Sequence, residues 1–237
     1  MARTQTFDQL NNMSTEWFSK MDISAEAKKK RVDLSMLYAE IFFMYFDYVI
    51  MGMLETKEQM VEWLDERLNI VASNYIGKDD LAYVNDWSIK EAEQIAETTV
   101  KHKDDEPEYW VEPTPEGGTE DVVKTFDFEE FDVSVPQNEY WTSDIRGLLL
   151  AIECANSVAN YYEIYDALER GMTNKVWITE ADDRVRKTHN EVDHTDIPIT
   201  DLFVVGDSYL LFPADISHGA EMKEVCSCRC HLEFYKK

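Results

Sequence analysis

Residues 143–179 read SDIRGLLLAIECANSVANYYEIYDALERGMTNKVWIT, and this stretch decides the fold class. Thr142 or Ser143 can cap a helix, and Asp144 stands in its first turn, where a negative charge is favoured. Apolar residues then recur at intervals of three and four until Gly171 provides a stop signal. This stripe consists of Ile145, Leu148, Leu149, Ile152, Ala155, Ala159, Tyr162 and Leu168. The sequence therefore predicts a long amphipathic helix.

A small antiparallel sheet is predicted after this helix. The run KVWIT at 175–179 has the β-branched and aromatic content of a strand. The apolar runs LFVV and YLLF flank the turn residues of GDS at 206–208 and indicate a hairpin. Between the strand at 175–179 and this hairpin, the charged stretch EADDRVRKTH at 180–189 is predicted to form a short helical turn capped by Asp182. The fold class predicted for residues 142–237 is therefore α+β, with one long helix packed on a small antiparallel sheet.

Residues 1–103 are predicted to form a helical region. Apolar residues follow a helical period over 24–54 and 56–73, and a shorter, more polar helix is predicted over 89–100. Aromatic residues nearly encircle the first of these helices, so it must be covered by its own domain or by another chain. We therefore take three of its rings as candidates for binding a partner: Phe42, Phe43 and Phe46.

Residues 104–141 form an acidic segment without a helical period. Residues 104–139 hold 13 acidic side chains and one basic side chain, together with four of the six prolines. Aromatic residues are spaced among the acids, which is typical of an extended segment that lays anchors on a neighbouring surface. A solvated linker is the alternative. The candidate anchors are Tyr109, Trp110, Phe126, Phe128 and Phe131.

The formal net charge of the whole chain is −25. A surface this negative repels phosphates, so extensive nucleic-acid binding is not expected. The longest apolar run, at 37–54, is interrupted by Glu40 and Asp47, so no membrane partner is expected either. The first 18 residues lack the pattern of a signal peptide. We therefore expect synthesis in a reducing cytoplasm, where free thiols are the default.

Three of the four cysteines, Cys226, Cys228 and Cys230, lie at alternate positions near the C-terminus. If this segment is an extended strand, their thiols line one face about 6 to 7 Å apart, which does not close a tetrahedral zinc site without a turn. With a turn, zinc could be held by Cys228 and Cys230 if His189, His194, His218 or an aspartate supplies the other ligands, and His189 is the candidate that we name. The alternatives are buried free thiols and a nucleophilic pair with a histidine, for which His231 is badly placed because neighbours on a strand point to opposite faces.

Several short motifs occur in a fixed order towards the C-terminus: IECANSVAN at 152–160, GMTNKVWITEADDRVRKTH at 171–189, LLFPADISHGAEM at 210–222 and CRC at 228–230. Their order and spacing resemble the phage Mu F-like head morphogenesis family, the minor head proteins of tailed bacteriophages, over roughly residues 144–231. The residues that match the family's motifs are Arg146, Glu153, Lys175, Trp177, Asp182, Asp183, Arg184, Arg186, His189, Pro213, Asp215, Cys228, Arg229 and Cys230.

The chain departs from the family's pattern in two places. Ser227 stands where the family has an asparagine before the first cysteine, and Asp193-His194 replaces the Asp-Gly that often follows the histidine. Cys226 is an additional cysteine without a counterpart in the pattern.

The resemblance implies a low-copy bacteriophage virion protein at the portal vertex inside the head, present in the host cytoplasm during assembly. Its implied partners are the portal protein, the major capsid protein or a scaffold protein, and its implied role is in head assembly or in DNA packaging and ejection. We therefore expect no catalytic residue and no cofactor. A bound zinc ion is the alternative to the absence of a cofactor.

Two other functions follow from the residues themselves. The net charge favours an acidic binding module, such as a DNA mimic that inhibits a host protein. The second is an enzyme that uses Glu153, Asp182, Arg186 and His189 in proton transfer and anion binding. These four side chains could equally form a salt-bridged network that fixes the helix against the sheet.

Overall fold

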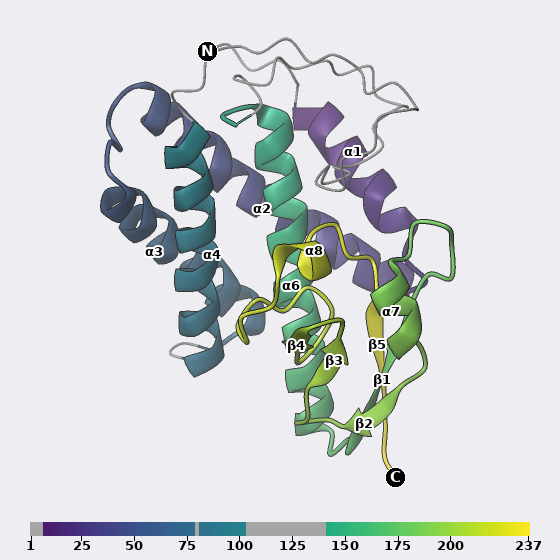
Figure 1. Cartoon of the computed structure of the whole chain (residues 1–237). Helices are drawn as coiled ribbons and strands as arrows, with labels where there is room; N and C mark the ends of the chain where they lie inside the picture. Colours follow the sequence, from purple (N-terminus) through teal and green to yellow (C-terminus); the bar gives the residue numbers. More distant parts are fainter. Residues whose placement is uncertain (1–6, 79–80, 103–140) are drawn as a thin grey trace, which may run out of the picture.

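The computed structural model describes residues 7–78, 81–102 and 141–237 (Figure 1). The predicted α+β class is confirmed: a helical N-terminal region is followed by one long helix and a small antiparallel sheet. The elements are α1 Phe7–Ser19, α2 Ala25–Ile50, α3 Lys57–Ile76, α4 Ala82–His102, α6 Asp144–Glu169, β1 Asn174–Ile178, α7 Lys187–Val192, β2 Asp196–Pro198, β3 Phe203–Val205, β4 Ser208–Leu210, α8 Met222–Val225 and β5 His231–Tyr235. The candidate anchors Tyr109, Trp110, Phe126, Phe128 and Phe131 lie outside the described residues.

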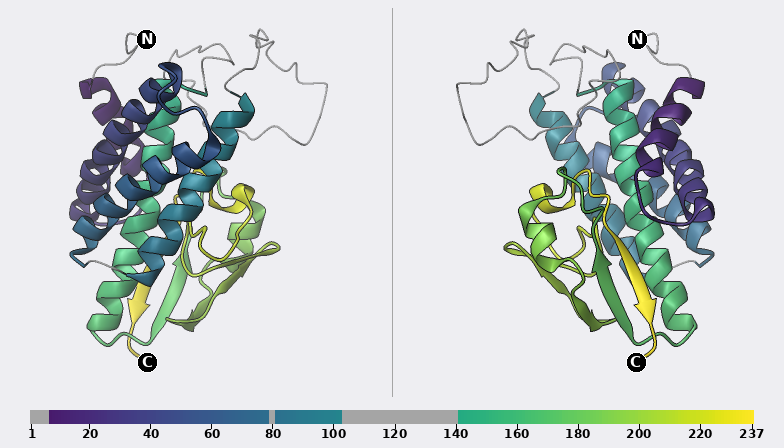
Figure 2. Two further views of the ribbon diagram at one scale, coloured as in Figure 1. Left: turned by 90° about the vertical axis from the view of Figure 1, so that its left-hand side faces the viewer. Right: turned by 90° about the vertical axis from the view of Figure 1, so that its right-hand side faces the viewer.

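The long helix α6 runs through the centre of the molecule (Figures 1 and 2). It begins as expected, because the Ser143 hydroxyl accepts a hydrogen bond from the Arg146 backbone N–H at 3.2 Å. It ends where Gly171 adopts the left-handed conformation, with φ of 73°. Most of its length is buried on all sides, although Leu168 in its last turn is 44% exposed. One hydrophobic core therefore surrounds α6 and extends from α1 to β5.

Helix α2 packs more extensively on α6 than any other element does. The exposed fractions of Phe42, Phe43 and Phe46 are 0%, 3% and 2%, so the chain's own core covers these three rings. The partner contact expected of them is replaced by packing within the chain. The large apolar side chains of this region that do remain exposed are Leu37, Met44, Ile50, Met51 and Met53.

Gly147 allows the close approach of α6 to α2. A Cβ atom at this position would lie 2.9 Å from Cε1 of Phe43 and 3.5 Å from Cβ of Phe42. Because the ring of Phe43 is itself buried, Gly147→Val is expected to lower the free energy of unfolding by about 1–3 kcal/mol through overpacking. Urea denaturation followed by circular dichroism measures this change. A stability equal to that of the wild type would show that the two helices can separate at no cost.

The other N-terminal helices differ in part from their predicted bounds. The Thr56 and Gln59 side chains form a capping box at the start of α3, in agreement with the predicted start. Helix α4 begins at Ala82, well before the predicted residue 89. The sequence prediction missed its first two turns because the buried residues Val84 and Trp87 stand among polar neighbours that hide the helical period. Among the described residues no helix has both the length and the apolar character needed to cross a membrane.

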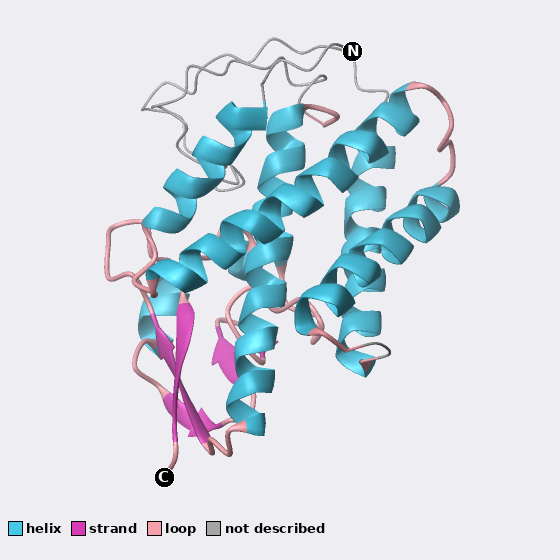
Figure 3. Cartoon of the chain, turned by 180° about the vertical axis from the view of Figure 1, so that it is seen from behind, coloured by secondary structure: helices cyan, strands magenta, loops and turns pink. Residues whose placement is uncertain are grey.

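The sheet lies beside the C-terminal half of α6 (Figure 3). Its central strand is β1, which pairs antiparallel with β2 on one side and with β5 on the other. Strands β3 and β4 form the predicted hairpin, with Phe203 opposite Leu210. Because β5 is the last element in the sequence, its pairing with β1 brings the cysteine-rich segment next to the charged stretch after β1.

Candidate functional site

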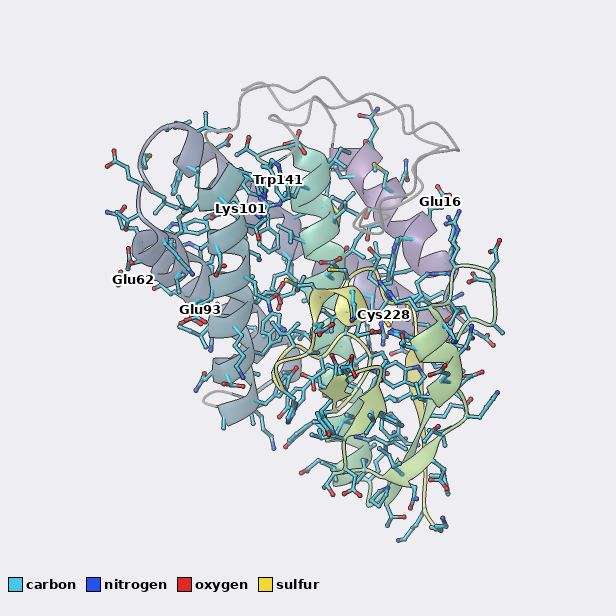
Figure 4. All side chains as sticks on the ribbon, in the orientation of Figure 1. Glu16, Glu62, Glu93, Lys101, Trp141 and Cys228 are labelled. Carbon is cyan, nitrogen blue, oxygen red and sulfur yellow. The ribbon has the colours of Figure 1, made fainter. Side chains whose placement is uncertain are left out.

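The segment that carries the cysteines is a turn and not an extended strand. Cys226 ends α8, Ser227 has a φ of +52°, and β5 begins only at His231. The left-handed Ser227 breaks the alternation that an extended chain would impose on the thiols. Cys228 consequently lies between α7 and α8 in the middle of the molecule (Figure 4).

This turn brings Cys228 and Cys230 to the imidazole of His189 on α7. The Nδ1 atom of His189 lies 3.4 Å from Sγ of Cys230 and 3.7 Å from Sγ of Cys228. The three potential ligand atoms all lie within 4.8 Å of one another. The three residues are 1–3% exposed, so the cluster is closed off from bulk solvent on most sides. Among the described residues this is the group whose side chains could hold a metal ion.

A buried carboxylate stands on the opposite side of the His189 ring. The Glu224 Oε2 atom lies 3.4 Å from Nε2 of His189 and accepts a hydrogen bond of 2.7 Å from the Thr188 hydroxyl. Both the His189 and the Glu224 side chains are only 2% exposed. Gly206 in the β3–β4 turn closes this corner, because a Cβ atom there would lie 2.9 Å from Oε1 of Glu224.

The environment of the cluster shifts the pKa values of its two thiols in opposite directions. The hydrogen bond from Cys230, together with His189, lowers the pKa of Cys228 well below its ordinary value. The pKa of Cys230 is raised, first by the same hydrogen bond and then by burial. Burial works to lower the pKa of His189, but the neighbouring Cys228 and Glu224 raise it overall.

The charged stretch contacts the same turn; it forms a hydrogen-bonded turn at Asp182–Val185, and its helix begins later than the cap predicted at Asp182. Helix α7 starts only at Lys187, and Asp182 lies before it, where its carboxylate accepts a hydrogen bond from the Arg184 backbone N–H at 3.1 Å. Such a local bond competes with helix formation. The Asp182 carboxylate also binds the Arg229 guanidinium, with distances of 2.8 Å and 2.7 Å to its two oxygens.

Two further side chains fix the backbone of the turn. Arg186 donates a hydrogen bond to the carbonyl oxygen of Cys226, and the Glu153 carboxylate accepts one of 3.0 Å from the Ser227 N–H. Burial raises the pKa of Glu153 to about 7. Its neighbour Glu91 on α4 contacts the thiol of Cys154 at 3.7 Å, and burial followed by the proximity of Glu153 raises the pKa of Glu91 to about 8.

The four residues of the enzyme hypothesis, Glu153, Asp182, Arg186 and His189, therefore share one partner. Each binds the turn at 226–230, and no hydrogen bond or ion pair joins any two of them within the part of the chain that the structure describes. This arrangement favours the network interpretation, in which they hold the C-terminal turn in place, over a catalytic group that converges on a substrate.

A second group of motif residues meets at the turn after β4. Lys175 is fully buried, and its Nζ atom donates a hydrogen bond of 2.6 Å to the carbonyl oxygen of Leu211. Asp215 accepts a hydrogen bond of 2.7 Å from the Leu211 N–H, and Asn160 on α6 donates one of 2.7 Å to the carbonyl oxygen of Pro213. Burial lowers the pKa of Lys175 to about 7, although Asp215 opposes that shift.

Sequence reasoning did not place Ser217 and His218 beside Asp215. The Ser217 hydroxyl lies 2.5 Å from Oδ1 of Asp215 and 2.9 Å from Nδ1 of His218, and the same Nδ1 lies 2.9 Å from Oδ2 of Asp215. In a catalytic triad the serine binds the ring nitrogen that the carboxylate does not use. Here both partners use Nδ1, so these three residues stabilise a turn.

The remaining motif residues lie apart from the cysteines or at the edge of the cluster. Arg146 is buried among the helices, where it donates hydrogen bonds to Thr99 and to the Trp141 carbonyl at the far end of α6 (Figure 4). Trp177 on β1 packs its ring edge-on against His189 at 5.5 Å between centroids. Asp183 and Arg184 are exposed beside Asp182.

Ser227 stands where the family that the sequence resembles has an asparagine. Asparagine is enriched in the left-handed region that Ser227 occupies. We therefore expect Ser227→Asn to raise the free energy of unfolding by about 0.5–1 kcal/mol, and chemical denaturation measures this. Ser227→Val should lower it, because a β-branched residue is strained at positive φ. Equal stabilities of the two variants would contradict the conformation assigned to the turn.

The motif residues thus gather into one group around the cysteine turn and a second around Leu211, with Trp177 between them and Arg146 apart. No protein-family model matches this chain, and neither the curated proteins nor the solved structures gave a match to it.

Proposed function

We propose that this chain is a minor head protein of a tailed bacteriophage, which acts in head morphogenesis at or near the portal and in the packaging or ejection of DNA. The observation that supports the proposal most is the pairing of separate motifs with one another. Asp182 binds Arg229, and His189 faces Cys228 and Cys230. Motifs that pair in the fold belong to one structural module, as expected if their order in the sequence reflects a family.

The described acidic surface is consistent with a protein–protein role. Glu62 and Glu93 lie on the outer faces of α3 and α4, and the charge of the whole chain disfavours tight contact with DNA (Figure 4). The proposed partners are therefore the portal, major capsid or scaffold proteins. The alternative of a DNA mimic depends on the acidic residues 104–139, all of which lie outside the described residues, and no observation on the described part favours it.

Co-sedimentation with phage particles tests this proposal. Procapsids and mature heads are purified from a lysate of the phage or prophage that encodes the chain, and the protein is quantified by mass spectrometry. We expect a few copies per particle, and we expect a strain that lacks the gene to accumulate defective heads. Absence of the protein from both kinds of particle, with normal heads in the deletion strain, would overturn the proposal.

A further inference from the structure

We propose that His189, Cys228 and Cys230 bind a zinc ion, with the fourth coordination position open to the recess beside them. The inference follows from the arrangement of side chains alone, and a zinc ion here would not depend on a role in head assembly.

The distances from the His189 imidazole to the two thiols fit tetrahedral zinc, and all three ligand atoms lie within 4.8 Å of one another. With Zn–S bonds of about 2.3 Å and Zn–N bonds of about 2.0–2.1 Å, ligand atoms in a tetrahedron lie about 3.5–3.8 Å apart. The observed distances from Nδ1 of His189 are 3.4 Å to Cys230 and 3.7 Å to Cys228. No backbone rearrangement is therefore needed to bring these ligands to one ion.

The imidazole presents its Nδ1 atom to the two cysteines and its Nε2 atom to Glu224. Histidine ligands usually donate their second ring N–H to a carboxylate or carbonyl, which fixes the tautomer and leaves the other nitrogen free for the metal. In this fold Oε2 of Glu224 lies 3.4 Å from Nε2 of His189, which has no hydrogen-bond partner among the described residues, and Glu224 is itself held by the Thr188 hydroxyl. Nδ1 is therefore the nitrogen directed at the two sulfur atoms, and Glu224 acts as a positioning residue.

The turn that carries the cysteines is anchored independently of any metal. Arg229, which stands between the two ligands in the sequence, binds Asp182 through both carboxylate oxygens. The Asn156 amide on α6 donates a hydrogen bond of 2.9 Å to the carbonyl oxygen of Cys228. These contacts explain why a motif of the form Cys-Arg-Cys suits this position: the cysteines point inward and the arginine closes the turn from outside.

The charge and the type of the ligands select zinc. Two thiolates and one neutral imidazole neutralise a divalent cation, so the buried site would carry no net charge, and binding would release the thiol protons. Thiolate and imidazole ligands in a tetrahedral arrangement favour zinc over magnesium or calcium, which prefer oxygen. A small recess borders the cluster and is lined by Glu180, Arg186 and Ser227 among others. Water or a partner's side chain would complete the coordination from this recess.

Metal analysis of the purified full-length chain tests the proposal. We expect about one zinc per chain after gel filtration in a buffer with micromolar zinc chloride, measured by inductively coupled plasma mass spectrometry. Cys228→Ser and Cys230→Ser are expected to lose the metal. Cys226→Ser is the matched control, because it makes the same change in the same turn outside the cluster, and it is expected to retain the metal.

Two further measurements cover the case in which a ligand variant fails to fold. Glu224→Gln keeps all three ligands, and we expect its zinc affinity to fall about 10–100-fold, as is typical when the partner of a ligating histidine is removed. In the wild-type chain, stripped with a chelator and loaded with cobalt chloride, we expect the thiolate-to-cobalt band and the intense visible bands of a tetrahedral site. Three results would each overturn the proposal: no metal on the wild-type chain, equal loss in Cys226→Ser, or an intact mass lower by two hydrogens, which indicates a disulfide.

Discussion

Arg31→Met is expected to lower the free energy of unfolding by about 2–5 kcal/mol, because it removes the donor from two buried amide oxygens and the partner of the part-exposed Glu163. The Arg31 side chain is 1% exposed on α2. It donates hydrogen bonds of 3.1 Å to Asn156, 2.8 Å to Asn160 and 2.8 Å to Glu163 along α6. Methionine preserves most of the volume but leaves two buried amide oxygens without a donor, and each orphaned group costs about 1–3 kcal/mol.

The effect should reach the C-terminal turns as well. Asn156 and Asn160 use their amide nitrogens to hold the carbonyl oxygens of Cys228 and Pro213. We therefore expect Arg31→Met to increase the reactivity of the Cys228 thiol towards an alkylating reagent. Lys29→Met is the matched control, since Lys29 pairs with Asp33 on the exposed side of the same helix, where such pairs contribute less than about 1 kcal/mol. Similar losses of stability in the two variants would contradict the role of Arg31.

The stability of the chain is expected to fall as the pH rises from about 4.5 to 8, because Glu91 on α4 is buried beside the half-buried Glu153 on α6. Burial, and then the proximity of Glu153, raises the pKa of Glu91 to about 8, from 4.5 in the unfolded chain. In that window the folded state binds more protons than the unfolded state, so raising the pH favours unfolding. The stabilisation is complete below pH 4.5 and is lost as the pH passes the folded pKa.

Glu91→Gln should remove most of this dependence. Relative to the wild type, we expect it to gain on the order of 4 kcal/mol between pH 5 and pH 9. The difference between the two proteins is the quantity to measure, by denaturant unfolding at several pH values. Lys175 contributes with the opposite sign, because its lowered pKa makes stability rise above pH 7, and its contribution cancels in the difference. Glu93→Gln is the control, because Glu93 is exposed on the same helix. If the stability of Glu91→Gln changed with pH in parallel with that of the wild type, the raised pKa of Glu91 would be refuted.

The regular helices and strands could be predicted from periodic apolar patterns and from cap and turn residues. The stripe from Ile145, the cap at Ser143 and the stop at Gly171 predicted α6, and the turn residues at Gly206 predicted the β3–β4 hairpin. These signals are local. The same signals could not show that Phe43 is covered by α6, because that contact joins residues about a hundred positions apart and depends on the absence of a side chain at Gly147.

The residues of the candidate site could be named from the sequence, but their arrangement could not. The alternation rule placed the three thiols on one face of a strand, whereas the left-handed Ser227 turns the chain and separates Cys226 from the other two. The sequence did not single out Glu224, because it is one of 48 acidic residues and belongs to none of the motifs. Its role depends on Thr188 and on the glycine of a distant hairpin.

The zinc K-edge X-ray absorption spectrum of the purified full-length chain tests the His189–Cys228–Cys230 centre most directly. We expect two sulfur neighbours at about 2.3 Å and two nitrogen or oxygen neighbours at about 2.0–2.1 Å, one of them an imidazole. Bound zinc surrounded only by nitrogen and oxygen would contradict the centre, because it would place the metal elsewhere on this acidic chain.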